Sequence, residues 1–260
     1  MGLLAFRAFA RQQGQHTGTA REQAAGPAGL ADAVTKTVQG PHQIRNFPAL
    51  GLHQKLMLRV LGEGDMLYSG QYGGFELQEL DSAVRAIEAM PNVEVGGVCS
   101  FPCFLYDEAA QDILPMPNLR TVQTAAEMLR ARGYRDLMLN TPSATCTHSI
   151  PMIAAAGGTH GEPGHGLTGT TPYHAGHPDA EERPGYLYVS EVSHNLGDKA
   201  YCYGGGHYRR GHMKNALVGT TPENAKIVPV LPPDDSSIDY HFELQQNCPV
   251  SAAAVMAFRT

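Results

Sequence analysis

Residues 159–165 read Thr-His-Gly-Glu-Pro-Gly-His, and this stretch decides the fold. A strand predicted over residues 159–162 ends in an acid, Glu162. The Pro-Gly turn after it leaves main-chain N–H groups available to a ligand. A turn of this kind at the carboxyl end of a late strand in a (β/α) barrel binds a phosphate group. The acid then lies beside the ring that the phosphate anchors. The alternative is an ordinary turn with a surface glutamate.

Strands alternate with helices upstream of this turn. Strands are predicted over 56–61, 93–101 and 136–140, and helices over 76–90, 118–132 and 149–156. Such alternation indicates a parallel sheet and favours a (β/α) barrel. Only about three and a half strand–helix units fit between residues 55 and 170, whereas a closed barrel needs eight. We therefore predict a partial barrel in a chain that is truncated at both ends.

Downstream the pattern changes to strands alone. Residues 171–185 form a predicted linker rich in Pro, Gly and His, and the strands after it are predicted over 186–194, 200–203, 215–219, 226–231, 238–244 and 250–258. This is the pattern of an all-β domain. The expected organisation is α/β, with a poorly defined segment over 1–54, a partial barrel over 55–175 and a smaller β domain over 186–260. No regular pattern is recognisable in residues 1–50.

Composition excludes several classes of protein. The net charge is −6 and no run of Lys or Arg stands out, so no nucleic-acid partner is expected. No apolar stretch reaches the roughly 18 residues of a membrane helix. The five cysteines are odd in number and scattered, which favours a reducing cytoplasm over a disulfide framework. The 29 glycines and 12 histidines are unusual, and many fall between residues 157 and 212.

A second turn that suits a phosphate group is Asn-Thr-Pro-Ser-Ala-Thr, residues 140–145. It follows a predicted strand, and the Ser143 hydroxyl can donate to a phosphate oxygen together with the turn amides. The alternative is a serine that caps a helix. If the phosphate belongs to pyridoxal 5′-phosphate (PLP), Glu162 beside the pyridine nitrogen would keep that nitrogen protonated and make the ring a better electron sink.

A third motif lies in the β domain, where residues 201–212 combine three tyrosines, a run of glycines and an Arg-Arg pair. A phenol near cations, here Tyr203, can act in proton transfer. The alternative is a β-bulge with aromatic core residues. His160-Gly-Glu162 resembles the H-x-E of zinc deaminases, but no P-C-x-x-C follows. No metal ligand is therefore assigned, and a His-rich metal hydrolase is kept as an alternative.

Several segments, in order over about residues 55–260, resemble the YhfX-type family of PLP enzymes, which are relatives of alanine racemase. The resembling segments are YSGQYGGF (68–75), SFPCFLYDEA (100–109), PNLRT (117–121), NTPSAT (140–145), THGEPGHGLTGTTP (159–172), SEVSH (190–194), YCYGGGHYRRGH (201–212) and DDSSIDY (234–240). The resemblance implies the alanine racemase fold, PLP as cofactor, a homodimer and an amino acid or related small molecule as substrate.

The resemblance also assigns roles to single residues. Ser143 becomes a phosphate ligand, and Gly164 and His165 add main-chain N–H groups to the phosphate. Glu162 replaces the racemase's arginine at the ring nitrogen, which leaves room for elimination, aldol cleavage or transamination beside racemization. Tyr203 stands where the catalytic tyrosine acts across a dimer interface. Ser100 replaces the histidine that stacks on the ring.

The lysine that binds PLP covalently is the weak point of the resemblance. The family places it on the first barrel strand, and Lys36 in Val-Thr-Lys is the nearest echo, only about twenty residues before the strand at Leu56. The expected activity is that of a racemase-like isomerase or a related lyase acting at the α-carbon of an amino acid. Without the lysine, a non-catalytic protein that binds PLP or another phosphometabolite is the alternative.

Overall fold

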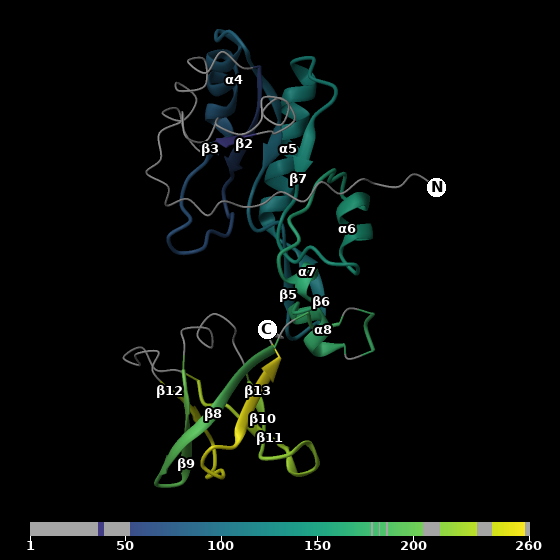
Figure 1. Cartoon of the computed structure of the whole chain (residues 1–260). Helices are drawn as coiled ribbons and strands as arrows, with labels where there is room; N and C mark the ends of the chain where they lie inside the picture. The colour runs from purple at the N-terminus through teal and green to yellow at the C-terminus, as the bar shows by residue number, and fades with distance from the viewer. Residues whose placement is uncertain are drawn as a thin grey trace. The chain divides into compact units, whose positions relative to one another are not determined.

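The computed structural model describes residues 53–177, 179–181, 183–185, 187–204, 214–232 and 241–257, together with the backbone of residues 36–38 (Figure 1). The chain divides into two compact units, residues 1–163 and 164–260. The domain boundaries expected from the sequence remain predictions. Most of the poorly defined segment 1–54 lies outside the described residues.

The first unit is built on a parallel sheet. In spatial order its described strands are β1 (Lys36–Val38), β2 (Gln54–Leu61), β4 (Val93–Cys99) and β7 (Met138–Asn140), and β3 (Phe75–Glu76) pairs with the end of β2. Every pairing is parallel, as strand–helix alternation predicts. β2 is buried almost throughout, which explains its continuous apolar run. β1 lies within residues 1–50, where the sequence shows no regular pattern. No strand was therefore expected at residues 36–38.

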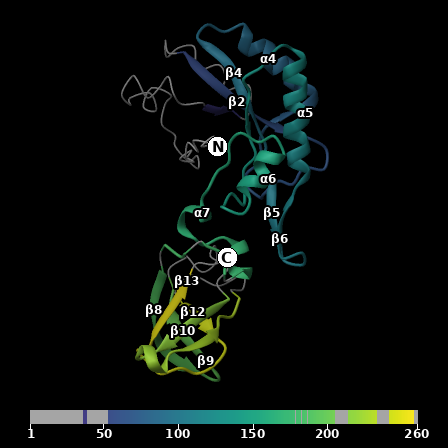
Figure 2. The same cartoon turned by 90° about the vertical axis from the view of Figure 1, so that its right-hand side faces the viewer.

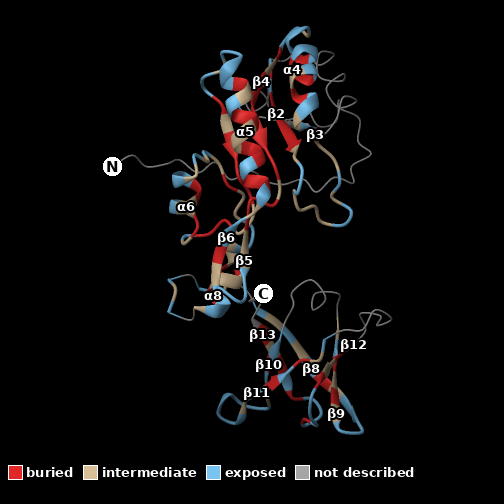
Figure 3. Ribbon diagram, turned by 180° about the vertical axis from the view of Figure 1, so that it is seen from behind, coloured by how far each residue is buried: buried red, intermediate tan, exposed pale blue. Residues whose placement is uncertain are grey.

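Two amphipathic helices, α4 (Leu80–Glu88) and α5 (Pro117–Ala131), lie on one side of this sheet (Figure 2). The turn of 3-10 helix η2 (Leu77–Glu79) precedes α4. Buried residues form one side of each helix (Figure 3), at the spacing that the sequence predicts. α5 begins with proline at its first position and ends before Gly133, whose φ of +102° allows the N–H of Tyr134 to reach the carbonyl of Leu129. The short helix α6 (Ile150–Ala155) follows β7.

Two expectations for this unit need correction. The strand predicted over residues 159–162 is reduced to an isolated parallel bridge between His160 and Asn140. A β-hairpin that the sequence did not suggest, β5 (Phe104–Asp107) with β6 (Asp112–Pro115), is inserted before α5. The bridge still sets residues 159–162 beside the end of β7, so their place at the carboxyl edge of the sheet agrees with the prediction.

The second unit opens with two short helices, α7 (His165–Thr168) and α8 (Pro172–Gly176). The linker predicted over residues 171–185 is therefore wrong at its start. Thr171 caps α8, because its Oγ1 accepts from the N–H of His174, and Pro172 fits the first helical position. His174 is 2% exposed and is part of the packed interior.

Downstream of α8 the described strands of the second unit pair antiparallel, in the stretch where the sequence predicts strands alone. Their bounds are β8 (Leu187–Leu196), β9 (Lys199–Tyr203), β10 (Asn215–Gly219), β11 (Lys226–Pro229), β12 (His241–Leu244) and β13 (Ala253–Ala257), with the 3-10 turn η3 (Pro222–Asn224) before β11. The spatial order is β11-β10-β13-β8-β9-β12. Val230 bridges Leu244, which brings the two ends of this sheet together around a core of alternate residues such as Val192, Phe242 and Met256.

Candidate functional site

Buried polar residues gather just beyond the carboxyl ends of β2, β4 and β7. Those with less than a tenth of their surface exposed are Ser100, Asn118, Thr121, Asn140, Thr141, Thr145 and Ser149. Parallel strands share one carboxyl edge, and this edge is where α/β folds place their ligand sites. This concentration of buried polar side chains marks the candidate site.

One hydrogen-bonded network ties the loop after β2 to the start of α5. Asp65 accepts bonds from the N–H of Gly62 at 2.9 Å and from Oγ1 of Thr121 at 2.8 Å. Asn118 bonds both the N–H and the carbonyl of Met66, and its Nδ2 also donates to Oγ of Ser100 at 3.1 Å. Ser100 thus joins loops after two neighbouring strands, in place of the histidine that the resemblance leads one to expect.

Sequence reasoning missed Arg59, a charged residue inside the apolar run of β2. Arg59 is 5% exposed, and its Nη2 donates to the carbonyl of Gln71 in the glycine-rich turn at 2.9 Å. The strand register aligns Arg59 with Cys99 and Cys99 with Asn140, so these three residues point to the same face of the sheet. A cation buried in a strand is costly to place, and its presence in an apolar stretch was the available signal.

The turn that contains Ser143 has the form expected of an anion-binding loop. Ser143 and Ala144 both have positive φ, +84° and +48°. Among the described residues, none accepts a hydrogen bond from the main-chain N–H of Ser143, Ala144 or Thr145. Ser149 holds the turn in place, because its Oγ donates to the carbonyl of Ala144 at 2.7 Å. Three successive N–H groups therefore remain for an acceptor from outside the described chain.

Glu162 lies against the end of β7. Its carboxylate Oε1 accepts from Nδ2 of Asn140 at 2.8 Å, and its main-chain N–H donates to Oγ1 of Thr145 at 3.1 Å. Within the described part of the chain, Oδ1 of Asn140 and Oγ1 of Thr141 are buried without a partner. Orphaned polar atoms beside a fixed carboxylate and a turn with open N–H groups fit a ligand that carries both an anionic group and hydrogen-bonding atoms.

Gly164 and His165, the other predicted phosphate ligands, belong to the second unit. Gly164 is the residue before α7, and the ring Nδ1 of His165 lies 3.1 Å from the carbonyl oxygen of Thr170. Their approach to Ser143 remains a prediction, because these residues fall in different compact units.

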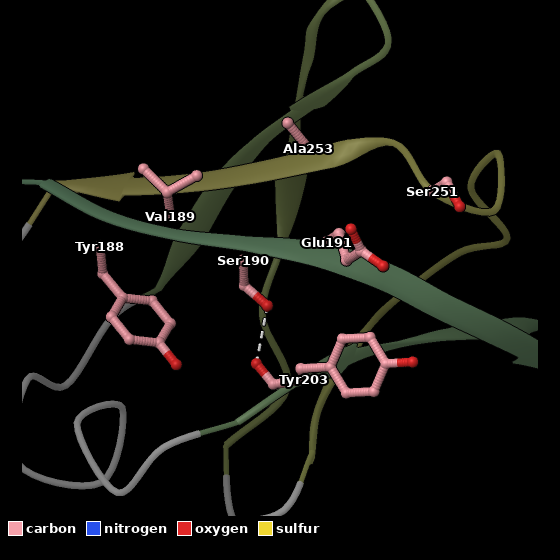
Figure 4. A pocket seen from close by; sticks show the side chains of 7 residues that line it. All are labelled: Tyr188, Val189, Ser190, Glu191, Tyr203, Ser251 and Ala253. Carbon is pink, nitrogen blue, oxygen red and sulfur yellow. Dashed lines mark hydrogen bonds between the residues drawn. The ribbon is translucent and has the colours of Figure 1, made fainter.

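Tyr203 ends β9 and is half exposed, at 52%. It lines a pocket of about 430 Å³ (Figure 4), whose other lining residues are Tyr188, Val189, Ser190, Glu191, Ser251 and Ala253. The Tyr203 carbonyl accepts from Oγ of Ser190 at 2.7 Å, and its ring lies 5.8 Å from that of His241. Glu191 lines the same pocket, so this pocket contains a phenol and a carboxylate. The rest of the glycine-rich motif, residues 205–212, lies outside the described residues.

Neither lysine of the first unit stands at the carboxyl edge. Lys36 is aligned with Leu56, whereas the residue of β2 in the row of Asn140 is Arg59. Three strand spacings and three residue steps separate Lys36 from Asn140, a Cα distance on the order of 15 Å. The Nζ of Lys55 lies 3.1 Å from Glu94 at the opposite edge. The register therefore puts the backbone of Lys36 three residue steps before the row of Asn140.

Among the described residues, no three His, Cys, Asp or Glu side chains come together in a way that could hold a metal ion. None of the described helices is long and apolar enough to cross a membrane.

Comparison with known proteins agrees with this architecture. The model of the alanine racemase N-terminal domain matches residues 16–172, and that of the YhfX-like C-terminal domain matches residues 187–260. The uncharacterized protein YhfX of Escherichia coli (strain K12) is 46% identical over 212 residues, which are 81% of this chain and 54% of that protein. The chain thus spans about half the length of this curated relative.

Solved structures show the same fold. The arginine decarboxylase of Paramecium bursaria Chlorella virus has a TM-score of 0.58 at 12% identity, covering 86% of this chain and 65% of its own. The D-threonine aldolase of Filomicrobium marinum has 0.53 at 13%, covering 88% and 62%. The alanine racemase of Corynebacterium glutamicum has 0.51 at 15%, covering 85% and 62%. The chain therefore belongs to the family of the alanine racemase N-terminal domain, and a YhfX-like C-terminal domain follows.

Proposed function

We propose that this chain binds PLP at the carboxyl edge of its parallel sheet and acts at the α-carbon of an amino acid, as a racemase-like enzyme or a related lyase. The observation that carries the proposal is the carboxylate of Glu162, held by Asn140 beside the open turn of Ser143. The alanine racemase, the arginine decarboxylase and the D-threonine aldolase that share the fold support chemistry on an amino acid, but they do not favour one reaction over another.

Each residue has a distinct part in this proposal. Ser143 and the N–H groups of its turn bind the phosphate, with the N–H groups of Gly164 and His165 as further donors. Glu162 accepts from the protonated ring nitrogen. Bound PLP supplies an electron sink that stabilises negative charge at the substrate's α-carbon. Tyr203 exchanges the α-proton, and its exposure on the β domain suits an assembly in which it serves a second copy of the chain.

A second function, non-catalytic binding of PLP or a related phosphometabolite, is favoured by the position of the lysines. In the first unit the backbone of Lys36 lies three residue steps before the row of Asn140, and Lys55 is paired with Glu94. Lys199 in the second unit is paired with Glu243 at 2.8 Å. An enzyme of this kind needs a lysine at the aldehyde of the cofactor, so the two functions differ in covalent attachment.

Titration of the full chain with PLP tests both functions. Saturable binding is expected, and S143A and E162Q should each weaken it about tenfold, the value of a hydrogen bond to a charged group. The matched control S82A removes an exposed serine hydroxyl on α4 and should bind PLP as the unaltered chain does.

Covalent attachment separates the two functions. Absorbance at about 420 nm and a lysine labelled after borohydride reduction would support the enzyme. Saturable binding without a labelled lysine would support non-catalytic binding. Absence of saturable binding, or S143A and E162Q variants that bind as well as S82A, would overturn the assignment of PLP.

A further inference from the structure

Asn140 opens the turn of residues 140–145, but neither that motif nor the family descriptions assign a function to its side chain. It is the last residue of β7 and is 5% exposed. Its main chain bridges His160, and its side chain reaches Glu162 two residues farther on, with Nδ2 2.8 Å from Oε1. The end of one strand thereby holds the acid of the adjacent turn.

The chemistry of the amide fixes its orientation. A carboxamide carries a donor group and an acceptor oxygen, and only the N–H group can face a carboxylate without repulsion. Nδ2 of Asn140 must therefore lie toward Glu162, and Oδ1 must point away from it. This Oδ1 is the buried atom that has no partner among the described residues.

The main chain of Glu162 is fixed independently. Oγ1 of Thr145 accepts from its N–H at 3.1 Å, and the preceding Gly161 packs so closely that a β-carbon there would lie 2.8 Å from Cγ2 of Thr145. Among the described residues, no hydrogen bond to Oε2 of Glu162 is found. One carboxylate oxygen is thus held, and the other is left to meet a donor.

A purely structural role does not account for Asn140. Leucine or valine could fill a buried strand end without leaving a carbonyl oxygen unpaired, and an unpaired buried acceptor is a net cost to stability. The cost is explained if the amide is needed for its N–H group, which neither apolar residue provides.

We propose that Asn140 is the positioning residue for Glu162, holding Oε1 so that Oε2 faces the ring nitrogen of a bound pyridoxal phosphate. The proposal rests on the proposed function. It adds that a carboxylate on a flexible side chain needs a second group to keep it in line with a ring whose phosphate is anchored elsewhere.

Arg59 lies in the same row as Asn140, and two further titratable groups near Glu162 are Cys103 and His160. Burial raises the pKa of the Cys103 thiol well above its usual value, and the charges of Cys99, Asp65 and Glu162 raise it further. Cys103 therefore stays a neutral thiol near neutral pH. His160, the neighbour along the chain, has its Nδ1 2.8 Å from Oγ1 of Thr159.

The test uses 4′-deoxypyridoxine 5′-phosphate, which has the ring nitrogen and the phosphate of PLP but no aldehyde, so surface lysines cannot bind it covalently. Its affinity for the full chain is measured by fluorescence for N140L, E162Q and the double variant. N140L and E162Q should each weaken binding about tenfold, and the double variant should bind about as weakly as E162Q alone. In contrast, S143A combined with N140L should show the product of the two single effects, because these residues hold different parts of the ligand.

The absorbance of the bound ligand gives a readout that a structural role would not change. The ring should lose its proton at a lower pH in N140L and in E162Q than in the unaltered chain, by similar amounts. N140D keeps the size of the side chain but sets a second carboxylate against Glu162, and it should bind as weakly as N140L. Thermal melting confirms that each variant is folded.

The outcomes separate the two claims. Multiplicative effects of N140L and E162Q, or an N140L variant with an unchanged absorbance titration, would overturn the role of Asn140 and leave the PLP site standing. No saturable binding of the ligand by the unaltered chain would overturn the proposed function, and the role of Asn140 with it.

Discussion

At the scale of single residues, Cys202 links burial to the pH dependence of stability. Burial, and next the neighbouring Cys248, raises the pKa of the Cys202 thiol from 9.0 to about 12. The folded state therefore disfavours the thiolate, and this stabilising contribution is complete below the unfolded pKa and is lost as the pH rises from 9 toward 12. We expect the free energy of unfolding to fall over this range, by at most about 1.4 kcal/mol per pH unit from this thiol.

The C202A variant isolates that contribution, because tyrosines and lysines ionise in the same range in both proteins. Urea unfolding from about pH 8 to about pH 11 should show a shallower loss of stability for C202A. Equal slopes for the two proteins would contradict the assignment, whatever their absolute stabilities.

Local sequence was enough to place Glu162 and Ser143 in candidate turns, because a Pro-Gly pair and a short polar turn after a strand are local signals. Asn140 and Arg59 were missed as site residues. Each ends or interrupts an apolar run, and its meaning depends on a partner far along the chain, 22 residues away for Asn140 and Glu162. Such pairs arise from strand register, which a single sequence does not reveal.

At the scale of elements, the network around Asn118 connects α5 to two strand-end loops. Asn118 is fully buried, and N118A would leave the N–H and carbonyl of Met66 without their partners. Met66 is only half-buried, so each lost bond costs about 1–2 kcal/mol, and we expect N118A to lower the free energy of unfolding by roughly 2–4 kcal/mol. Chemical denaturation measures this loss.

The neighbouring Arg120 is exposed on the same turn of α5, and R120A should change stability by less than about 0.5 kcal/mol. If N118A lowered the free energy of unfolding no more than R120A does, the network around Asn118 would not stabilise the fold. PLP binding by N118A at a temperature where it is folded then reports whether the loop also shapes the site.

Elements with local signals were predicted within a few residues, as for α5, whose proline start and Gly133 end are explicit. The hairpin of β5 and β6 was not, because its turn lacks glycine. Asp107 bonds the N–H groups of Ala109 and Ala110, and Gln111 takes φ of +53°. The strand expected at 159–162 fails because Oγ1 of Thr159 and Oγ1 of Thr145 take bonds that a ladder would use.

At the scale of the whole molecule, the change from helix–strand alternation to strands alone predicted the two architectures, and the fold comparisons agree. The place of Lys36 could not be predicted. Lys36 pairs with Leu56 of the neighbouring parallel strand, but the sequence around Lys36 shows no periodicity that would predict a strand there. Pattern reasoning needs such periodicity, so it gives no information about that stretch.

The second unit has the features of a domain that folds alone. Its described strands form one continuous sheet from β11 to β12, the bridge of Val230 with Leu244 joins the two ends, and its core lies within the same unit. We expect a fragment of residues 164–260 to give a dispersed NMR spectrum and a cooperative urea transition. F242A removes a core ring that is 1% exposed, and its cost of about 3–5 kcal/mol approaches the stability of a small domain. I227A alters a side chain that is 73% exposed and should leave the fragment folded. A fragment with random-coil shifts would mean that the closed sheet requires the first unit, and the two architectures would then be one folding unit.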